Sequence, residues 1–353
     1  MKFESPGYDV HQICMGEVQV TTVVEDFLEH QLLERRQRLE RAVASGGQDR
    51  ARRLLQDVDE ALARFESGTY GICEVCHESV ESDRLIADPL VRVCLDHLSA
   101  VERSALEQDL QLAAQVQRGL LPRQNVATAG WQVSYHYEPA SVVSGDYCDV
   151  VDAANAGLYF MLGDVSGKGV AASMLTAHLH AMFRSLISVG MSLKSMVEHA
   201  SRVFAESTLP THYATLVVGR AFPDGRVEIC NAGHPHPLVI RKNGVTALED
   251  SGLPVGLFRD EEFSVGELQL DGGDSLLLYS DGVSEATNGT GIEYGADRLR
   301  RLIERFGVVP PEEMIAACRE DVLRFCDGAP KTDDVTILAL SRVNPALAPR
   351  LTA

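Results

Sequence analysis

The rest of this chain is organised around the stretch Leu162-Gly163-Asp164-Val165-Ser166-Gly167-Lys168-Gly169. Apolar and aromatic residues at 158–161 lead into it, and an alanine-rich segment at 170–186 follows it. This order is typical of a strand, a tight glycine turn and a buried helix. Asp164 would then stand where a strand ends, a position from which side chains are often presented to a functional site.

Three other acidic turns lie beside apolar runs, and they are Gly145-Asp146-Tyr147-Cys148-Asp149, Ser280-Asp281-Gly282 and Thr332-Asp333-Asp334-Val335. Alone, each aspartate is more often a turn or capping residue. Carboxylates that a fold gathers from distant positions also suit Mg²⁺ or Mn²⁺, because these hard cations prefer oxygen ligands. Two such ions can generate hydroxide near neutral pH and clamp a phosphoryl group, so no side-chain nucleophile is required.

Five motifs in a fixed order carry a family resemblance, and they are SGDYCD (144–149), GDVSGKG (163–169), NAGHPHP (231–237), YSDGVSEA (279–286) and DDVTILAL (333–340). They resemble the bacterial PPM-type serine/threonine phosphatases of the SpoIIE and RsbU kind, over roughly the last two thirds of the chain. The resemblance implies hydrolysis of phosphoserine or phosphothreonine by water that two Mn²⁺ or Mg²⁺ ions activate. It also implies a substrate, a phosphorylated anti-sigma-factor antagonist of the STAS type in a partner-switching pathway.

The same resemblance assigns roles to single residues. Asp164 would bridge both ions, with the carbonyl of Val165 as a neighbouring ligand. Asp281 and Asp333 would complete the second ion's site, and Asp146 would lie near the water shell of the first. Asp334 stands where some family members have asparagine. The expected metal ligands are therefore Asp164, Val165, Asp281, Asp333 and Asp334. The expected catalytic residues are Asp146, Asp164, Asp281 and Asp333.

The segment from 123 to 345 alternates strand patterns with long helix patterns. Strands are expected at 131–137, 158–165, 213–222, 226–231, 237–241, 263–270, 275–280 and 335–341. Helices are expected at 171–189, 192–207, 296–306 and 311–326. Turns such as Pro223-Asp224-Gly225 favour antiparallel pairing. The expected fold class is α+β, a two-sheet antiparallel β sandwich flanked by helices (PP2C-like), preceded by a helical hairpin with a small zinc finger and a linker helix.

Two helix patterns precede this segment. Apolar residues recur at helical spacing within 25–44 and within 54–65, on either side of Ser45-Gly46-Gly47. This indicates an antiparallel helical hairpin, which would serve as a packing or dimerisation element. Residues 1–24 stay unassigned apart from a short strand pattern at 17–24.

A cysteine-rich stretch follows the hairpin. Cys73-x2-Cys76 is separated by seventeen residues from Cys94-x2-His97, and these four side chains fit one structural, tetrahedral Zn²⁺ with no open position. The segments GTYGICEVC, DRLIADP and VCLDH resemble the zinc finger of the DksA/TraR family, whose members bind in the secondary channel of RNA polymerase. Here the fourth ligand is a histidine, and the hairpin turn lacks an acidic tip. The resemblance to this family gives the alternative function, a transcription regulator that acts on RNA polymerase through this module, with the phosphatase domain as sensor or partner platform.

The segment between the zinc module and the phosphatase segment has an apolar stripe. Its members recur at steps of three and four until proline stops the helix, and they are Leu106, Leu110, Ala113, Val116 and Leu120. In RsbU-like phosphatases a similar segment links sensor to phosphatase, dimerises and switches the enzyme. We therefore expect a homodimer through a coiled-coil linker helix; the other interpretation is a plain rigid linker.

Composition narrows the function further. Acidic residues outnumber basic ones 51 to 32, and the net charge of -19 repels nucleic-acid backbones, so direct nucleic-acid binding is not expected. Gly169 follows Lys168, which departs from the phosphate-binding loop of nucleotide hydrolases. There is neither a signal-peptide pattern nor an apolar run of membrane-spanning length, so we expect a cytoplasmic protein without membrane contact whose eight cysteines are thiols or metal ligands.

At 353 residues the chain is too long for one ordinary core, so several domains are expected. The predicted division is an unassigned segment at 1–24, hairpin and zinc finger at 25–98, linker helix at 99–122, phosphatase domain at 123–345 and a tail at 346–353.

Overall fold

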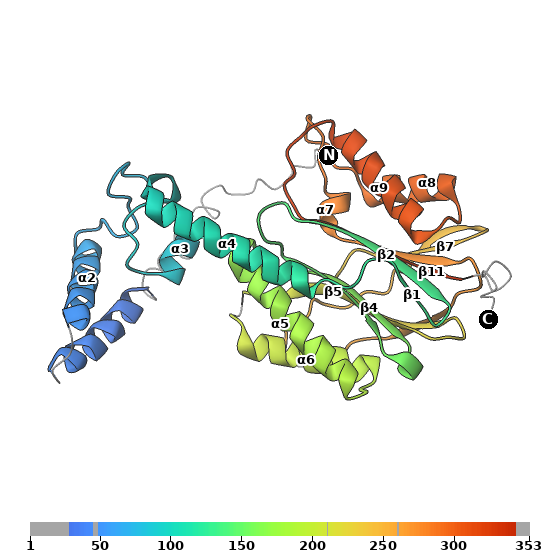
Figure 1. The fold of residues 1–353 in the computed structure, drawn as a ribbon, viewed down its shortest axis with the longest axis horizontal. Coiled ribbons are helices and arrows are strands. Elements are labelled where there is room, and N and C mark those ends of the chain that lie inside the picture. Colours follow the sequence, from blue (N-terminus) through green and yellow to red (C-terminus); the bar gives the residue numbers. More distant parts are fainter. Residues whose placement is uncertain (1–27, 45–48, 210, 260, 344–353) are drawn as a thin grey trace, which may run out of the picture. The chain divides into compact units, whose positions relative to one another are not determined.

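The computed structural model describes residues 28–44, 49–209, 211–259 and 261–343 (Figure 1). The chain falls into two compact units, which divide between Glu107 and Gln108. The strand predicted at 17–24 and the turn Ser45-Gly46-Gly47 lie outside the described residues. Among the helices that are described, none combines the length and hydrophobicity that a membrane crossing requires.

The N-terminal unit contains the predicted helical hairpin and the cysteine-rich module. Residues 28–44 are helical, and α2 spans Asp49–Glu66. The two helices pack through the fully buried Leu32, Val58 and Ala61. Two short helices follow, α3 at Ser82–Ala87 and η1 at Leu95–His97. The predicted hairpin helices are confirmed over the described residues, whereas α3 was not predicted.

Two antiparallel sheets form the C-terminal unit. The six-stranded sheet has the order β1-β2-β11-β10-β7-β8, with strands at Val126–Thr128, Trp131–Glu138, Val335–Arg342, Ser275–Tyr279, Leu238–Arg241 and Gly244–Ala247. The five-stranded sheet has the order β3-β4-β5-β6-β9, with strands at Asp146–Asp152, Leu158–Val165, Ala214–Ala221, Arg226–Ala232 and Gly266–Gln269. The turn η2 at Ala154–Ala156 joins β3 to β4.

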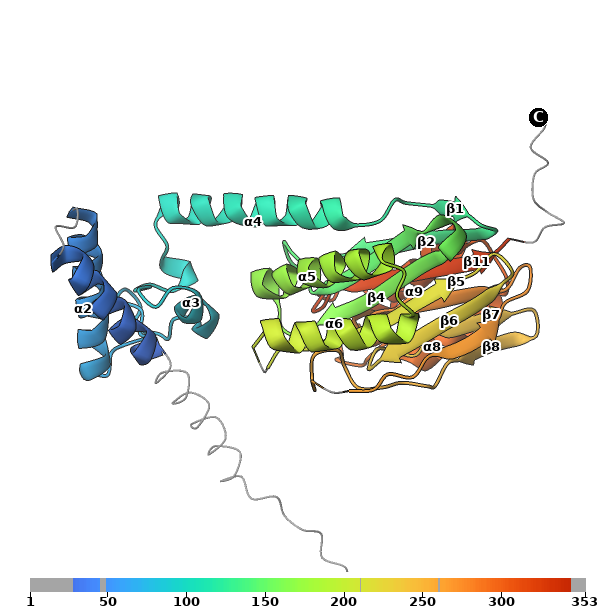
Figure 2. The same cartoon turned by 90° about the horizontal axis from the view of Figure 1, so that it is seen from below.

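Helices cover the outer faces of both sheets, while a shared apolar core fills the space between them (Figures 1 and 2). Helices α5 (Gly169–Ser188) and α6 (Leu193–Ser207) pack on the five-stranded sheet. Helices α8 (Ala296–Phe306) and α9 (Pro311–Cys326) pack on the six-stranded sheet, and the short α7 (Asp281–Ser284) follows β10. The predicted fold class, a two-sheet antiparallel sandwich flanked by helices, is confirmed.

One structural expectation was wrong. Residues 145–149 were predicted to form an acidic turn, but Asp146 begins strand β3, which pairs with β4 along its whole length. The sequence pattern did not indicate this strand because Asp149, although charged, is fully buried in β3. Its carboxylate forms a bidentate ion pair with Arg184 on α5 (2.6 and 2.7 Å). A buried, paired carboxylate occupies a position where an apolar side chain is the usual signal.

The linker segment forms one helix, α4, at Ala100–Leu120. Ser99 begins it with a capping box, because its hydroxyl accepts a bond from the amide of Glu102 while the Glu102 carboxylate accepts one from the amide of Ser99. In the part that belongs to the C-terminal unit, Ala114 and Gln117 are buried, whereas Leu112 and Val116 are 59% and 57% exposed. The helix therefore buries one face through Ala114 and Gln117 and leaves apolar side chains exposed on another, and dimerisation stays a prediction.

Candidate functional site

Asp164 and Asp146 meet at one end of the five-stranded sheet. Asp164 lies next to last in β4, Asp146 begins β3, and the two residues face each other in the strand register. The preceding Gly145 packs against this pair so closely that a Cβ atom there would lie 2.9 Å from Oδ1 of Asp164. Because glycine has no Cβ atom, Gly145 avoids a steric clash with the carboxylate of Asp164.

Asp281, Asp333 and Asp334 come from the neighbouring sheet. Asp281 begins α7 directly after β10, and the two consecutive aspartates directly precede β11, the strand that pairs with β10. A side chain on Gly282 would collide with the backbone carbonyl of Asp334, so the two turns touch through backbone alone. The sheet pairing thus brings together carboxylates that are more than fifty residues apart in the chain.

The electrostatics show that these carboxylates share one region. Burial raises the pKa of Asp164 to about 7, and the charges of Asp281, Asp333 and Asp334 add to the rise. The pKa of Asp281 is also raised, first by burial and then by Asp333. The ammonium of Lys168 lies 3.2 Å from Oδ2 of Asp333 and opposes both rises. Such a set of hard oxygen donors that repel one another fits a divalent Mn²⁺ or Mg²⁺, whose charge would remove the repulsion.

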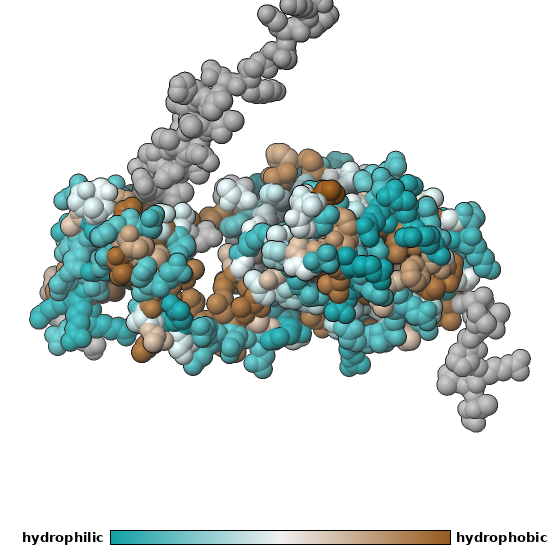
Figure 3. Space-filling view, turned by 90° about the horizontal axis from the view of Figure 1, so that it is seen from above, coloured by the Kyte–Doolittle hydropathy of each residue, from teal (hydrophilic) through white to brown (hydrophobic). Residues whose placement is uncertain are grey.

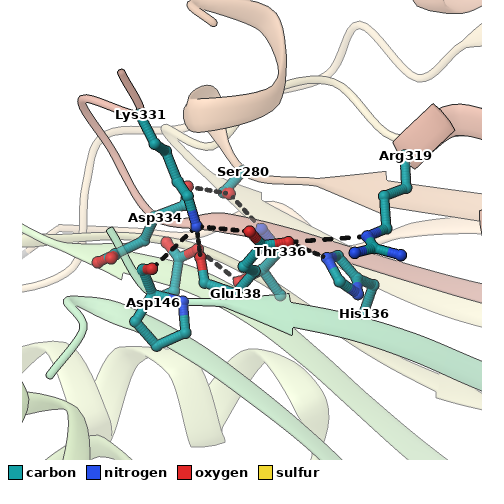
Figure 4. A network of polar contacts seen from close by, with 9 residues as sticks. His136, Glu138, Asp146, Ser280, Arg319, Lys331, Asp334 and Thr336 are labelled. Carbon is teal, nitrogen blue, oxygen red and sulfur yellow. Dashed lines mark hydrogen bonds and ion pairs between the residues drawn. The ribbon is translucent and has the colours of Figure 1, made fainter. Parts of the chain in front are cut away.

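Asp146 is held by a buried polar network (Figure 4). The Thr336 hydroxyl donates to Oδ2 of Asp146, and the Thr336 amide donates to the hydroxyl of Ser280 at 2.9 Å. Burial, followed by the charge of Asp164, raises the pKa of Asp146 well above its usual range. Asp334 orders the neighbouring loop instead, because its two oxygens accept the backbone N–H groups of Ala140 (2.6 Å) and Gly145 (2.8 Å).

Gln117 of α4 is a supporting residue that the sequence did not reveal. It is 7% exposed, its Nε2 donates to the carbonyl of Ser144 at 2.7 Å, and its Oε1 accepts the Ser144 amide at 3.0 Å. Ser144 directly precedes Gly145 and Asp146, so the linker helix is bonded to the loop that carries the site. A glutamine at the inward spacing of the apolar stripe was the available signal.

His234 is a second such residue. Its backbone exchanges two hydrogen bonds with the Asn231 side chain, at 2.9 and 3.0 Å. The imidazole is buried, which lowers its pKa to about 3, and Nδ1 lies 2.9 Å from the hydroxyl of Thr215. Thr215 faces Asp164 across the β4–β5 pair. A neutral histidine therefore supports the strand next to the one that ends at the acidic cluster.

The predicted zinc ligands converge in the N-terminal unit. The donor atoms of Cys73, Cys76, Cys94 and His97 all lie within 4.8 Å of one another, and the Sγ atoms of Cys76 and Cys94 are 3.8 Å apart. A tetrahedral ion with Zn–S bonds of about 2.3 Å requires nearly this separation. Among the described residues, this is the one group that the structure already closes around a single point. The aspartates, which repel one another, are not closed in this way.

The two-sheet sandwich with its covering helices is the fold of solved PP2C domains. Residues 154–343, more than half of the chain, match the family described as Stage II sporulation protein E (SpoIIE). The chain belongs to the SpoIIE family. Residues 68–96 match the prokaryotic dksA/traR C4-type zinc finger, and this match ends just before His97. Both predicted resemblances are thereby confirmed.

Individual relatives agree with the two matches. The phosphoserine phosphatase RsbP of Bacillus subtilis is 29% identical over 51% of this chain and 46% of its own length. The RNA polymerase-binding transcription factor DksA of Caulobacter vibrioides is 36% identical over 18% of this chain and 45% of its own length. The solved SiaA-PP2C domain of Pseudomonas aeruginosa superposes with a TM-score of 0.62 at 20% identity, covering 69% of this chain and 99% of that domain, and shows the shared fold. The chain thus spans less than half the length of RsbP.

Proposed function

We propose that this chain is a metal-dependent protein phosphatase that hydrolyses phosphoserine or phosphothreonine in a STAS-type anti-sigma-factor antagonist. The observation that carries the proposal is the convergence of Asp164, Asp281 and Asp333 from two sheets into one region, where the charges of Asp281 and Asp333 raise the pKa of Asp164 and the charge of Asp333 raises that of Asp281. Membership of the SpoIIE family supports the reaction, and the similarity to RsbP supports a phosphoserine substrate.

Each acidic residue receives a distinct role in this proposal. Asp164 and the neighbouring carbonyl of Val165 would be ligands of the ions, Asp281 and Asp333 would complete the second ion's site, and Asp334 would add a ligand while it orders the loop. The two ions, when bound, supply hydroxide near neutral pH and offset the charge of the phosphoryl group.

The remaining residues would orient the attacking water, attract the phosphate and keep bulk water out of the site. Asp146, whose Oδ2 accepts a hydrogen bond from the Thr336 hydroxyl, would lie near the water shell of the first ion and would orient the water there. Lys168, whose side chain is 72% exposed beside Asp333, offers positive charge to an arriving phosphate. The buried network around Ser280 keeps bulk water away from the inner side of the acidic cluster.

The N-terminal unit is proposed to regulate the phosphatase. One structural Zn²⁺ on Cys73, Cys76, Cys94 and His97 would hold the module together, and α4 would pair with its copy in a homodimer. A direct action on RNA polymerase is not favoured as the main function, because the likeness to DksA covers 18% of the chain while the SpoIIE match covers more than half.

Phosphate release from a phosphoserine peptide tests the proposal. The purified full chain should turn over in Mn²⁺ and lose activity in EDTA, and Asp281→Asn should lower turnover at least about a hundredfold because transition-state charge loses its support. Asp297→Asn, an exposed aspartate on α8, is the matched control. Turnover that persists in EDTA, or in Asp281→Asn, would refute the metal-dependent reaction, and a phosphorylated STAS protein that resists the active enzyme would refute the substrate.

A further inference from the structure

A cavity of about 80 Å³ adjoins the acidic cluster on the six-stranded-sheet side. The last turns of α9, the end of α7 and the segment 329–333 surround it, and Asp333 and Gly282 form the wall nearest the cluster. One water needs about 10–15 Å³ by the same kind of measure, so the space holds a group of several heavy atoms. Whatever occupies this cavity lies next to a residue that we place in the metal set.

Most of the cavity wall is apolar. It is formed by Ala286, Val322, Leu323, Cys326, Ala329 and Val335. Leu323 is 53% exposed although α9 otherwise turns its apolar residues into the core. Apolar groups also lie exposed among hydrophilic ones on the side of the unit where α8 and α9 lie (Figure 3). An aliphatic group placed here would remove apolar surface from water on both partners.

Of the charged residues that line the cavity, all but Glu285 form an ion pair within the described part of the chain. Lys331 donates to Oε1 of Glu138 at 2.8 Å and to the carbonyl of Pro139 at 2.9 Å, which ties the segment 329–333 to the end of β2. His136 and Arg319 converge on the other oxygen of Glu138, at 2.9 and 3.7 Å (Figure 4). Because most of these charges are already paired and most of the wall is apolar, an uncharged occupant would gain more from this cavity than an ionic one.

We propose that this cavity is a specificity pocket for an aliphatic side chain that flanks the phosphorylated residue of the protein substrate. The inference rests on the proposed function, because its occupant is the phosphoprotein whose phosphate lies at the acidic cluster. Continuity supports this occupant: an extended substrate advances about 3.3–3.6 Å per residue, so a side chain a few positions from the phosphoserine reaches past Asp333.

A series of phosphopeptides in which a single leucine is placed at successive positions tests the pocket. Peptides that differ only in the placement of one leucine, at the three positions on either side of phosphoserine, are compared with all-alanine and aspartate versions by kcat/KM in Mn²⁺. We expect one position at which leucine exceeds alanine about tenfold, the size of effect that a few methylenes give in an apolar pocket. Leu323→Ser, which removes an exposed wall, and Ala329→Leu, which fills the space, should both reduce this ratio towards one.

Two controls separate the pocket from the reaction itself. p-Nitrophenyl phosphate is too small to use the pocket, so its turnover should be unchanged in Leu323→Ser and Ala329→Leu, which also reports that both variants fold. Phe306→Ser removes an equally exposed apolar side chain (51%) that does not line the cavity, and its leucine preference should match wild type.

The outcomes are distinct. If p-nitrophenyl phosphate is hydrolysed but no leucine position gains more than about twofold, the pocket proposal is overturned while the phosphatase stands. A preference that survives both pocket variants also overturns it. Activation by an unphosphorylated leucine peptide added separately would assign the cavity to an effector and reject the substrate side chain. No hydrolysis of any phosphoester in Mn²⁺ would instead refute the proposed function.

Discussion

Replacement of Gln117 by alanine tests how the linker helix supports the site. Gln117 is almost fully buried, and both ends of its amide bond to the backbone of Ser144. The substitution leaves the N–H and C=O of Ser144 without their partners. Each buried group that loses its partner costs about 1–3 kcal/mol, so we expect the free energy of unfolding to fall by about 3 kcal/mol. For a unit of this size that corresponds to roughly 6–12 °C in Tm.

The same change should reach the metal site. Ser144 leads into Gly145, whose N–H donates to Asp334 and whose backbone packs against Asp164. A looser loop should therefore raise the Mn²⁺ concentration that gives half-maximal phosphate release, beyond what a loss of folded protein explains. Thermal unfolding and a Mn²⁺ titration of activity, both on the full chain, measure the two effects.

Gln115→Ala is the matched control, because the same side chain is removed from an exposed position on the same helix. It should shift Tm by less than about 2 °C and leave the Mn²⁺ midpoint unchanged, as a surface substitution does. If Gln117→Ala behaves like this control in both measurements, the bonds to Ser144 carry neither stability nor metal affinity, and the reasoning fails.

Three further predictions concern the acidic cluster, the zinc group and the exposed face of α4. Folding raises the pKa of Asp164 from 3.8 to about 7, so the contribution of the Asp164 carboxyl to the free energy of unfolding is fully present below pH 4 and is lost as the pH rises through 7. Without metal, the Asp164→Asn variant should therefore have a higher Tm than wild type at pH 8 and the same Tm at pH 4. Cys94→Ser should lower bound zinc from one ion per chain to none and speed proteolysis within 68–98, with little change in Mn²⁺-dependent turnover of p-nitrophenyl phosphate. Val116→Glu should convert a dimer to a monomer in sedimentation and leave the circular dichroism spectrum of the folded chain unchanged, because the side chain is exposed in the single chain.

Each of these has a clear contrary result. A metal-free Asp164→Asn protein that melts below wild type at pH 8 would show that the carboxylate is not strained by its neighbours. Zinc retained in Cys94→Ser would remove that residue from the ligand set. A wild-type monomer would reject pairing through α4 and leave the plain-linker interpretation.

Much of the sandwich follows from local pattern, because β4 is a continuous apolar run and the glycine turn after it starts a helix. Strand β3 did not follow, since Asp146 and Asp149 are buried carboxylates whose partners, Thr336 and Arg184, lie 190 and 35 residues away. Only the fold shows that such a charge is compensated. Helix α7 was missed for a simpler reason, because four residues are too few to show a helical period.

The candidate site divides in the same way. The aspartates could be named from ordered motifs, since each stands at a strand end or turn. Their supports could not, because Gln117 and His234 act through contacts with Ser144 and Thr215 that the sequence order does not imply. The apolar stripe of α4 was also read as one face, whereas the structure half-buries Leu110 and exposes Val116.

The central claim is that Asp164, Asp281 and Asp333 hold the ions that make this chain a phosphatase. Its most direct test is a Mn²⁺ titration of the full chain in which bound ion, by calorimetry, and phosphate release are followed together after zinc is accounted for. Two ions per chain that bind over the same range in which activity appears, with both signals lost in Asp164→Asn, is the predicted result. Full activity with no Mn²⁺ bound, or undiminished binding by Asp164→Asn, would contradict it.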